Sequence, residues 1–168
     1  LLDVLARFKL VSDIYPADCY VRLTADCPLV DPVMIDQCVG ILITDKRVDL
    51  ASNALIRTYP RGIDVEVIRY SALHSAHEAA HDHHRSHVTT WITDNPTRYN
   101  VVGVVSGLND SDLRVTVDTP EDLAVVQDII TSLGTAPHSA RRIIEYLRAN
   151  PAVVARNAHI HQKPQIET

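Results

Sequence analysis

The chain has 168 residues, of which 46% are hydrophobic and 22% are charged, with a formal net charge of −5 at pH 7. These values fit one globular domain with a hydrophobic core and exclude a disordered chain. The acidic balance argues against a general binder of nucleic acid or of anionic membranes, which normally has a basic face. No apolar run approaches the length of a membrane span. We therefore expect a cytoplasmic protein with no signal peptide and no membrane partner.

The first strand of the chain ends in a carboxylate. An amphipathic helix at the N-terminus is followed by residues 20–24, which have the composition of a strand, and Asp26 comes directly after them. Asp31 and Pro32 then start a helix over 32–44, as a capping residue and a first-turn proline. In open α/β sheets, ligands bind beyond the carboxyl ends of the strands, so we expect Asp26 to face a ligand site. The apolar positions of the helix are Val33, Ile35, Val39, Leu42 and Ile43.

The middle of the chain combines short strands with a turn. Residues 48–51 form a strand, and a turn at 59–62 contains Arg61, which can hold a carboxylate bidentately. Residues 63–68 alternate with period two, which puts Asp64 and Glu66 on one face of a strand. A hairpin with a solvated polar face would explain the same pattern, and the residues alone favour that simpler alternative. Helices over 72–81 and up to residue 91, then an edge strand over 99–105, complete this region.

A second strand, over 113–117, also ends in a carboxylate, Asp118. Thr119 and Pro120 start the next helix, as a capping residue and a first-turn proline. Asp26 and Asp118 could share one Mg²⁺, which prefers oxygen ligands and usually binds through one or two carboxylates. Both could equally be ordinary capping or loop residues, because Asp is common before helices. A last helix is expected over 139–149.

Strands that alternate with helices predict an α/β fold with a mixed, mostly parallel sheet and an antiparallel or irregular excursion around residues 53–105. A separate motif, His77-Glu78-Ala79-Ala80-His81, matches H-E-x-x-H and suggests a zinc hydrolase. We expect the helix to break at Asp82, within one residue of the motif. An exposed histidine-rich connector is therefore the favoured interpretation of this segment.

Taken together, several segments resemble the cytidylyltransferase family that activates acidic sugars. The nearest branch is the spore coat polysaccharide biosynthesis type, related to acylneuraminate and 3-deoxy-manno-octulosonate cytidylyltransferases. The match keeps its order along nearly the whole chain. The matching segments are 21–32, 51–53, 59–67, 87–89, 117–123 and 157–163.

The resemblance implies a Rossmann-like nucleotidyltransferase (nucleotide-diphospho-sugar transferase) fold and CMP transfer from CTP to an acidic sugar, with release of pyrophosphate. It implies that Asp26 and Asp118 hold Mg²⁺ and that the protein is a homodimer. No catalytic side chain is assigned. The residues that the resemblance places on the substrate side are Arg61, Asp64, Glu66, His87 and Asn53.

The resemblance also implies a domain organisation. Residues 1–150 match a nucleotidyltransferase domain that lacks the basic, glycine-containing N-terminal loop of the family, so we expect an N-terminal truncation and weak CTP binding by this chain alone. Residues 53–95 form the sugar-pocket and dimerisation excursion, and residues 151–168 form a C-terminal tail. The alternative in another class is a non-catalytic or degenerate relative that serves as a dimerisation or binding module.

Overall fold

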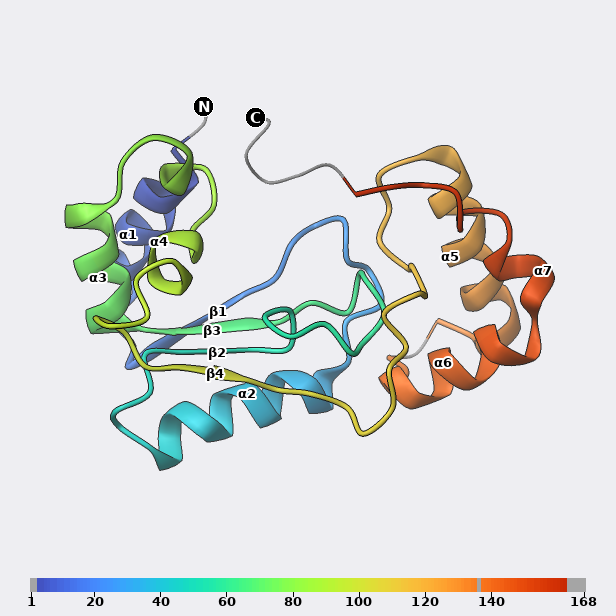
Figure 1. Ribbon diagram of the computed structural model, residues 1–168, viewed down its shortest axis with the longest axis horizontal. Coiled ribbons are helices and arrows are strands. Elements are labelled where there is room, and N and C mark those ends of the chain that lie inside the picture. Colours follow the sequence, from blue (N-terminus) through green and yellow to red (C-terminus); the bar gives the residue numbers. More distant parts are fainter. Residues whose placement is uncertain (1–2, 136, 163–168) are drawn as a thin grey trace.

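A mixed four-stranded sheet lies at the centre of the computed structural model, which describes residues 3–135 and 137–162 (Figure 1). The strand order is β1 (Cys19–Arg22), β3 (Glu66–Arg69), β2 (Leu50–Ser52) and β4 (Val101–Gly103). Strand β3 is antiparallel to β1 and to β2, whereas β2 and β4 are parallel. The α/β fold with a mixed sheet is confirmed, and β4 is at an edge as predicted. Only one of the three described pairs is parallel, because the excursion inserts β3 between β1 and β2.

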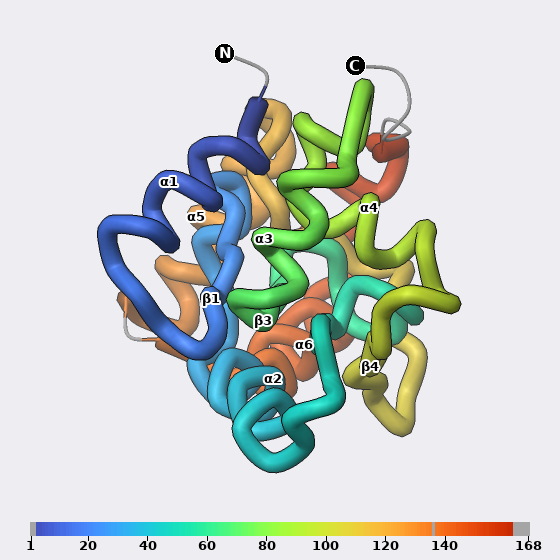
Figure 2. Tube along the Cα trace, turned by 90° about the vertical axis from the view of Figure 1, so that its left-hand side faces the viewer, coloured from blue at the N-terminus to red at the C-terminus, as the bar shows by residue number. Residues whose placement is uncertain are grey.

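One face of the sheet is covered by helices α1 (Val4–Ile14), α3 (Tyr70–Ala79) and α4 (Thr90–Thr93). Leu50 and Ile68 point to this face and are fully buried in one cluster with residues of these helices. Figures 1 and 2 show α3 on one side of the strands and α2 on the other. Side chains alternate along each strand, so the next residues in sequence belong to a second cluster on the opposite face.

Helix α2 (Pro32–Thr44) covers this opposite face with the predicted bounds. Its predicted cap is also confirmed, because the Asp31 carboxylate accepts a hydrogen bond from the Val33 amide at 2.8 Å. The prediction that Val33 and Ile43 belong to the apolar face was wrong, since both side chains are more than half exposed. The buried residues follow a spacing of four, which keeps them on one side of the helix. They are Met34, Cys38 and Leu42.

Helices α5 (Pro120–Leu133), α6 (Ala140–Ala149) and α7 (Pro151–Val154) form the other end of the molecule (Figure 1). They enclose a third buried cluster that includes Leu113 and Val115. Residues 113–117, predicted as a strand, form only an isolated parallel bridge between Arg61 and Arg114. Their apolar side chains pack against the C-terminal helices instead of extending the sheet. The described part of the C-terminal tail, including α7, is packed against α5 and α6.

Helix α3 starts two residues earlier than predicted and ends at Ala79, two residues earlier than predicted. A 3₁₀ helix, η1 (Asp82–Arg85), follows it and leads to the short α4. The polar break predicted at residues 82–84 is therefore confirmed. In the described part of the chain, every helix is too short or too polar to cross a membrane.

Candidate active site

The segment after β1 lies directly against residues 116–118. The Asp26 carbonyl accepts hydrogen bonds from the Val117 amide at 2.8 Å and from the Thr116 hydroxyl at 3.1 Å. The same hydroxyl lies 3.2 Å from a carboxylate oxygen of Asp26. The two carboxylate-bearing segments that the sequence separates by ninety residues are thus neighbours, and Asp118 is the next residue along.

Asp26 is ionised at neutral pH. Burial by itself raises the pKa of this carboxyl group, but hydrogen bonds from Thr24, Thr116 and Cys27 outweigh burial and hold the pKa below its ordinary value. The side chain is half-buried and lines the wall of a cavity. It is therefore a charged oxygen ligand that faces a space large enough for a small molecule.

The cavity has a volume of about 620 Å³ and lies at the ends of β1 and β3. Four of the residues predicted on the substrate side line it: Arg61, Asp64, Glu66 and His87. Most of the residues that line it are polar or charged, which suits a ligand rich in hydroxyl and phosphate groups. Further lining residues, not predicted from the sequence, are Arg22, Arg57, Thr89, Thr90, Thr93, Thr116 and Gln162.

The two acids of the predicted sugar pocket are already held by arginines. Arg57 binds the Asp64 carboxylate with two parallel hydrogen bonds of 2.7 and 2.9 Å. Glu66 forms an ion pair with Arg22 and accepts a hydrogen bond from the Thr89 hydroxyl at 2.6 Å. Both carboxylates are thereby fixed in orientation, and their negative charge toward the cavity is largely neutralised.

Arg61 provides a cation of a different kind. It is half-buried in the cavity wall, and no carboxylate among the described residues forms an ion pair with its guanidinium group. Burial, and then repulsion from Arg57, lowers the pKa of Arg61 from its very high ordinary value. A guanidinium group in this position suits an anionic ligand group such as a phosphate or a carboxylate.

Gly62 lets the Arg61 turn approach the 115–116 backbone closely. Its φ is +103°, and a Cβ atom on this residue would lie 2.2 Å from the amide nitrogen of Thr116. No other residue fits this contact, because the conformation and the space both exclude a side chain. The glycine thus fixes the distance between the Arg61 side of the cavity and the Asp26 side.

Asn53 lies beneath the cavity wall and is fully buried. Its side-chain amide donates to the Ile63 carbonyl at 2.7 Å and accepts from the Val65 amide at 2.8 Å. The structure therefore places Asn53 where it positions the backbone on both sides of Asp64. Asn53 is not among the residues that line the cavity, so in this arrangement it does not contact a ligand there directly.

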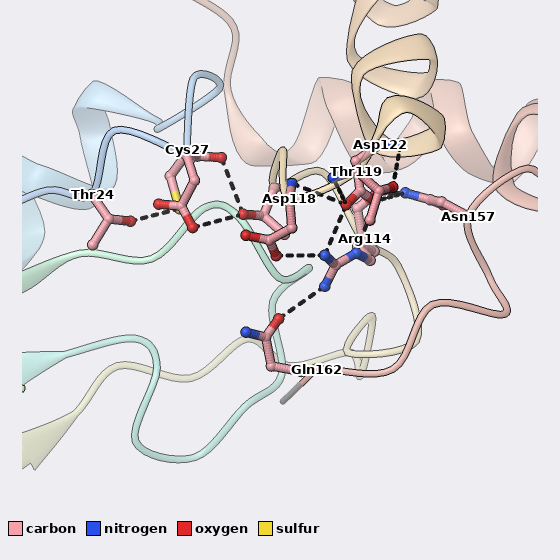
Figure 3. Close-up of polar contacts among 10 residues, drawn as sticks. Thr24, Cys27, Arg114, Asp118, Thr119, Asp122, Asn157 and Gln162 are labelled. Atoms are coloured by element: carbon pink, nitrogen blue, oxygen red, sulfur yellow. Dashed lines mark hydrogen bonds and ion pairs between the residues drawn. The ribbon is translucent and has the colours of Figure 1, made fainter. Parts of the chain in front are cut away.

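Arg114 connects Asp118 to the C-terminal segment (Figure 3). Its guanidinium group donates to Asp118 at 2.6 Å and to Gln162 at 2.9 Å. It also holds both oxygens of Asp122 at 2.8 Å. Asp122 is completely buried and accepts a further hydrogen bond from Asn157 at 2.9 Å. Burial alone would raise the pKa of Asp122, but the bonds from Arg114 and Asn157 lower it to about 2.

Comparisons with known proteins match most of this chain. It is 30% identical over 164 residues to an uncharacterized protein of Methanocaldococcus jannaschii, covering 96% of this chain and 66% of that protein. It is 30% identical over 154 residues to the spore coat polysaccharide biosynthesis protein SpsF of Bacillus subtilis, covering 88% of this chain and 62% of SpsF. The chain thus spans 66% and 62% of the length of these two curated relatives. No family model matches the chain.

A solved structure has the same fold. The fold matches a cytidylyltransferase from Leptospira borgpetersenii with a TM-score of 0.89 and 27% sequence identity, over 96% of this chain and 68% of that one. In fold and in sequence, this chain is similar to the cytidylyltransferase family. The resemblance found in the sequence and the nucleotidyltransferase fold that it implied are confirmed.

The carboxylates of Asp26 and Asp118 have the chemistry that Mg²⁺ requires. Asp26 is ionised and faces the cavity, and the Asp118 side chain is 41% exposed. One oxygen of Asp118 binds Arg114, so the other oxygen is left for a ligand. Mg²⁺ commonly binds through one or two carboxylates and completes its shell with water and phosphate oxygens. The residues present thus fit the ion, although Asp118 does not line the cavity itself.

The H-E-x-x-H motif does not form a zinc site of the hydrolase type. Such a site needs both histidines on one face of a continuous helix. Helix α3 ends at Ala79, and His81 has an extended backbone and is hydrogen-bonded to Asp82. His77 is engaged by Arg85. The zinc hydrolase considered from the sequence is therefore wrong.

Arg57, Arg114, Asp122 and Gln162 were not predicted from the sequence as residues of the site. Arg114 had a detectable signal, because the alternation that buries Leu113 and Val115 puts Arg114 on the same side as Asp118. Asp122 matched a capping residue, and the capping box with Thr119 is indeed present. Its complete burial depends on Asn157 and Arg114 and has no local signature.

Proposed function

We propose that this chain carries the nucleotidyl-transfer site of an enzyme that transfers CMP from CTP to a hydroxyl of an acidic sugar and releases pyrophosphate. The proposal includes a role in cell-surface polysaccharide biosynthesis, which is supported by the similarity to SpsF. The observation that carries it is the position of Asp26, an ionised carboxylate in the cavity wall beside residues 116–118, in a fold that matches a cytidylyltransferase.

The charges in the cavity support two kinds of ligand contact. Arg61 would bind the anionic group, either a phosphate of CTP or the carboxylate of the sugar, because its guanidinium group has the planar pair of donors that both anions accept. Thr89 and Thr116 also line the cavity, and their hydroxyls could contact sugar hydroxyls. Asp64 and Glu66 act mainly through the arginines that they hold in place.

Asp26 and Asp118 would hold Mg²⁺, the metal partner in this proposal. When bound, the ion would offset the negative charge of the triphosphate. The chain's own contribution is to keep Asp26 ionised through its hydrogen bonds and to fix the orientation of Asp118 through Arg114. No side chain in the cavity is assigned as a general base. Positioning of the sugar hydroxyl in line with the α-phosphorus would therefore supply much of the rate.

The assembly and setting are parts of the same proposal. We infer a homodimer through residues 53–95 and a cytoplasmic location, where CTP is available as a substrate. Size-exclusion chromatography with light scattering tests the first inference. A mass of one chain at every concentration would contradict the homodimer.

The test of the function is pyrophosphate release from CTP in the presence of Mg²⁺ and a panel of acidic and neutral sugars. For this chain, in which we expect weak CTP binding, the proposal predicts slow release with CTP and an acidic sugar, and loss of this release in Asp26→Asn. Asp128→Asn is the matched control, since Asp128 lies on α5, is not among the residues that line the cavity and pairs with Arg156. Release that is equal for neutral and acidic sugars would contradict the acidic substrate. CTP binding that is unaffected by Asp26→Asn would contradict the site.

A further inference from the structure

A cluster of potential metal ligands lies outside the cavity, on η1 and just after α4. The ligand atoms of His83, His84 and Asp94 all lie within 4.8 Å of one another. The His83 and His84 rings are 3.9 Å apart between centroids, and the Nε2 atom of His84 is 3.0 Å from a carboxylate oxygen of Asp94. His84 is buried, whereas Asp94 is exposed. The cluster is therefore reachable from solvent but anchored in the fold.

Both ring nitrogens of His84 face oxygen acceptors, an arrangement that favours a cation at this place. Its Nδ1 atom lies 3.3 Å from the His81 carbonyl oxygen, and its Nε2 atom faces the Asp94 carboxylate. A neutral imidazole has one N–H group, so it can donate to one of these oxygens only. If Nδ1 donates to the carbonyl, two electron pairs face each other across the contact with Asp94. Either a second proton on the ring or a metal ion between Nε2 and the carboxylate removes this conflict.

We propose that His83, His84 and Asp94 form a binding site for a transition-metal cation of the Zn²⁺ class. Ligand atoms about 2.0–2.2 Å from a tetrahedral Zn²⁺ lie roughly 3.3–3.6 Å apart, so the 3.0 Å contact between His84 and Asp94 needs to lengthen by only a few tenths of an ångström to admit the ion. A metal-bound imidazole usually donates its other N–H group to a carbonyl or carboxylate. The His81 carbonyl occupies that place. His83 and Asp94 are not fully buried, so both side chains can rotate to complete the shell.

This site differs from the two metal sites considered above. It uses neither histidine of the H-E-x-x-H motif as a ligand, and His81 contributes only its backbone carbonyl. Its two imidazoles favour Zn²⁺, Ni²⁺ or Cu²⁺ over Mg²⁺, which prefers oxygen ligands. Three protein ligands leave at least one position for water. The His-rich run, which the proposed nucleotidyl transfer does not use, thus has a function of its own.

The metal would fasten one wall of the cavity. His84 and Asp94 are the two ends of a segment that contains the cavity-lining residues His87, Thr89, Thr90 and Thr93. A metal that bridges its ends would reduce the motion of this wall, since ligands from both ends are bound to one ion. We therefore expect Zn²⁺ to stabilise the fold without taking part in the chemistry at Asp26.

Zinc binding can be measured on the chain without CTP. Trp91 is the only tryptophan of the sequence, and its ring lies edge-on to His84 with centroids 5.2 Å apart. After removal of metals with a chelator, titration with Zn²⁺ should change the tryptophan fluorescence, and calorimetry should give one Zn²⁺ per chain. Mg²⁺ in large excess should not compete. Absence of Zn²⁺ binding, or displacement by Mg²⁺, would overturn the proposal.

Substitutions assign the ligands. Asp94→Asn and His83→Gln should each weaken Zn²⁺ binding at least tenfold, and His84→Gln should do the same if the variant folds. Asp94 is exposed and His83 is not fully buried, so these two variants keep the test decisive if His84→Gln is unstable. His159→Gln is the matched control on an exposed histidine elsewhere and should leave binding unchanged. If Asp94→Asn and His83→Gln both bind Zn²⁺ as tightly as wild type, the binding is adventitious and the site is refuted.

Discussion

The Asp118 carboxylate accepts a hydrogen bond at 2.6 Å from Arg114, and Arg114 is itself fixed by two bonds to buried Asp122. The orientation of a proposed metal ligand is thus set from the interior of the protein. Only one oxygen of Asp118 remains for another partner. The Arg114–Asp122 pair therefore determines which oxygen of Asp118 can bind a metal ion.

Asp122→Asn should destabilise the fold in a pH-dependent way. The pKa of Asp122 is about 2 in the folded state against an ordinary 3.8, so its ionised form stabilises the fold by about 2 kcal/mol. Because the folded pKa is the lower one, this contribution is complete above pH 4 and is lost as the pH falls toward 2. Urea unfolding at several pH values should show a smaller decline between pH 4 and 2 for the variant. Asp128→Asn, on the same helix, should keep the wild-type pH dependence.

Gly62→Ala should damage the cavity and the fold together. The positive φ of Gly62 costs an alanine about 1–2 kcal/mol, and its Cβ would overlap the backbone of Thr116. We expect a loss of at least about 2 kcal/mol in the free energy of unfolding and weaker ligand binding. Gly107→Ala is the control, because a Cβ there meets no atom within 4 Å. A Gly62→Ala variant as stable as wild type would show that the 61–62 turn can move freely.

Arg61→Ala should weaken the binding of an anionic ligand tenfold or more, since a charge-assisted hydrogen bond contributes about 1.5–3 kcal/mol. Stability should change little, because no described carboxylate pairs with the Arg61 side chain. Comparison of KM for CTP and for the sugar identifies which ligand carries the anion that Arg61 binds. Arg141→Ala, on the exposed side of α6, is the matched control. Unchanged KM values for both substrates would remove Arg61 from the site.

Local patterns predicted the elements that depend on local chemistry. Asp31 with Pro32, and Thr119 with Pro120, mark helix starts that the structure reproduces, because capping is decided within four residues. The alternation around Asp64 and Glu66 also holds, with Ile63 and Val65 fully buried. The strand predicted at 113–117 was wrong, because whether a segment joins a sheet depends on distant partners and not on local chemistry. Its alternation is real, but the partner for its apolar side is a helix layer and not a sheet.

The candidate site shows the same division. Asp26 and Arg61 were found because each stands in a recognisable local motif. Arg22 and Arg57 were not found. Arg22 meets Glu66 through the register of β1 and β3, and Arg57 reaches Asp64 from a loop, so neither contact has a local pattern. The contacts of Gln162 and Asn157 with Arg114 join residues more than forty positions apart, and no pattern in a single sequence announces them.

The most direct measurement is CTP binding to this chain, with and without Mg²⁺, by isothermal titration calorimetry of wild type, Asp26→Asn and Asp128→Asn. The asparagine keeps the size of Asp26 and removes the charge that the hydrogen bonds of Thr24 and Thr116 preserve at neutral pH. We expect weak binding that Mg²⁺ strengthens in wild type and in Asp128→Asn, and no effect of Mg²⁺ in Asp26→Asn. Equal Mg²⁺ dependence in all three proteins, or none in wild type, would contradict the assignment of Asp26.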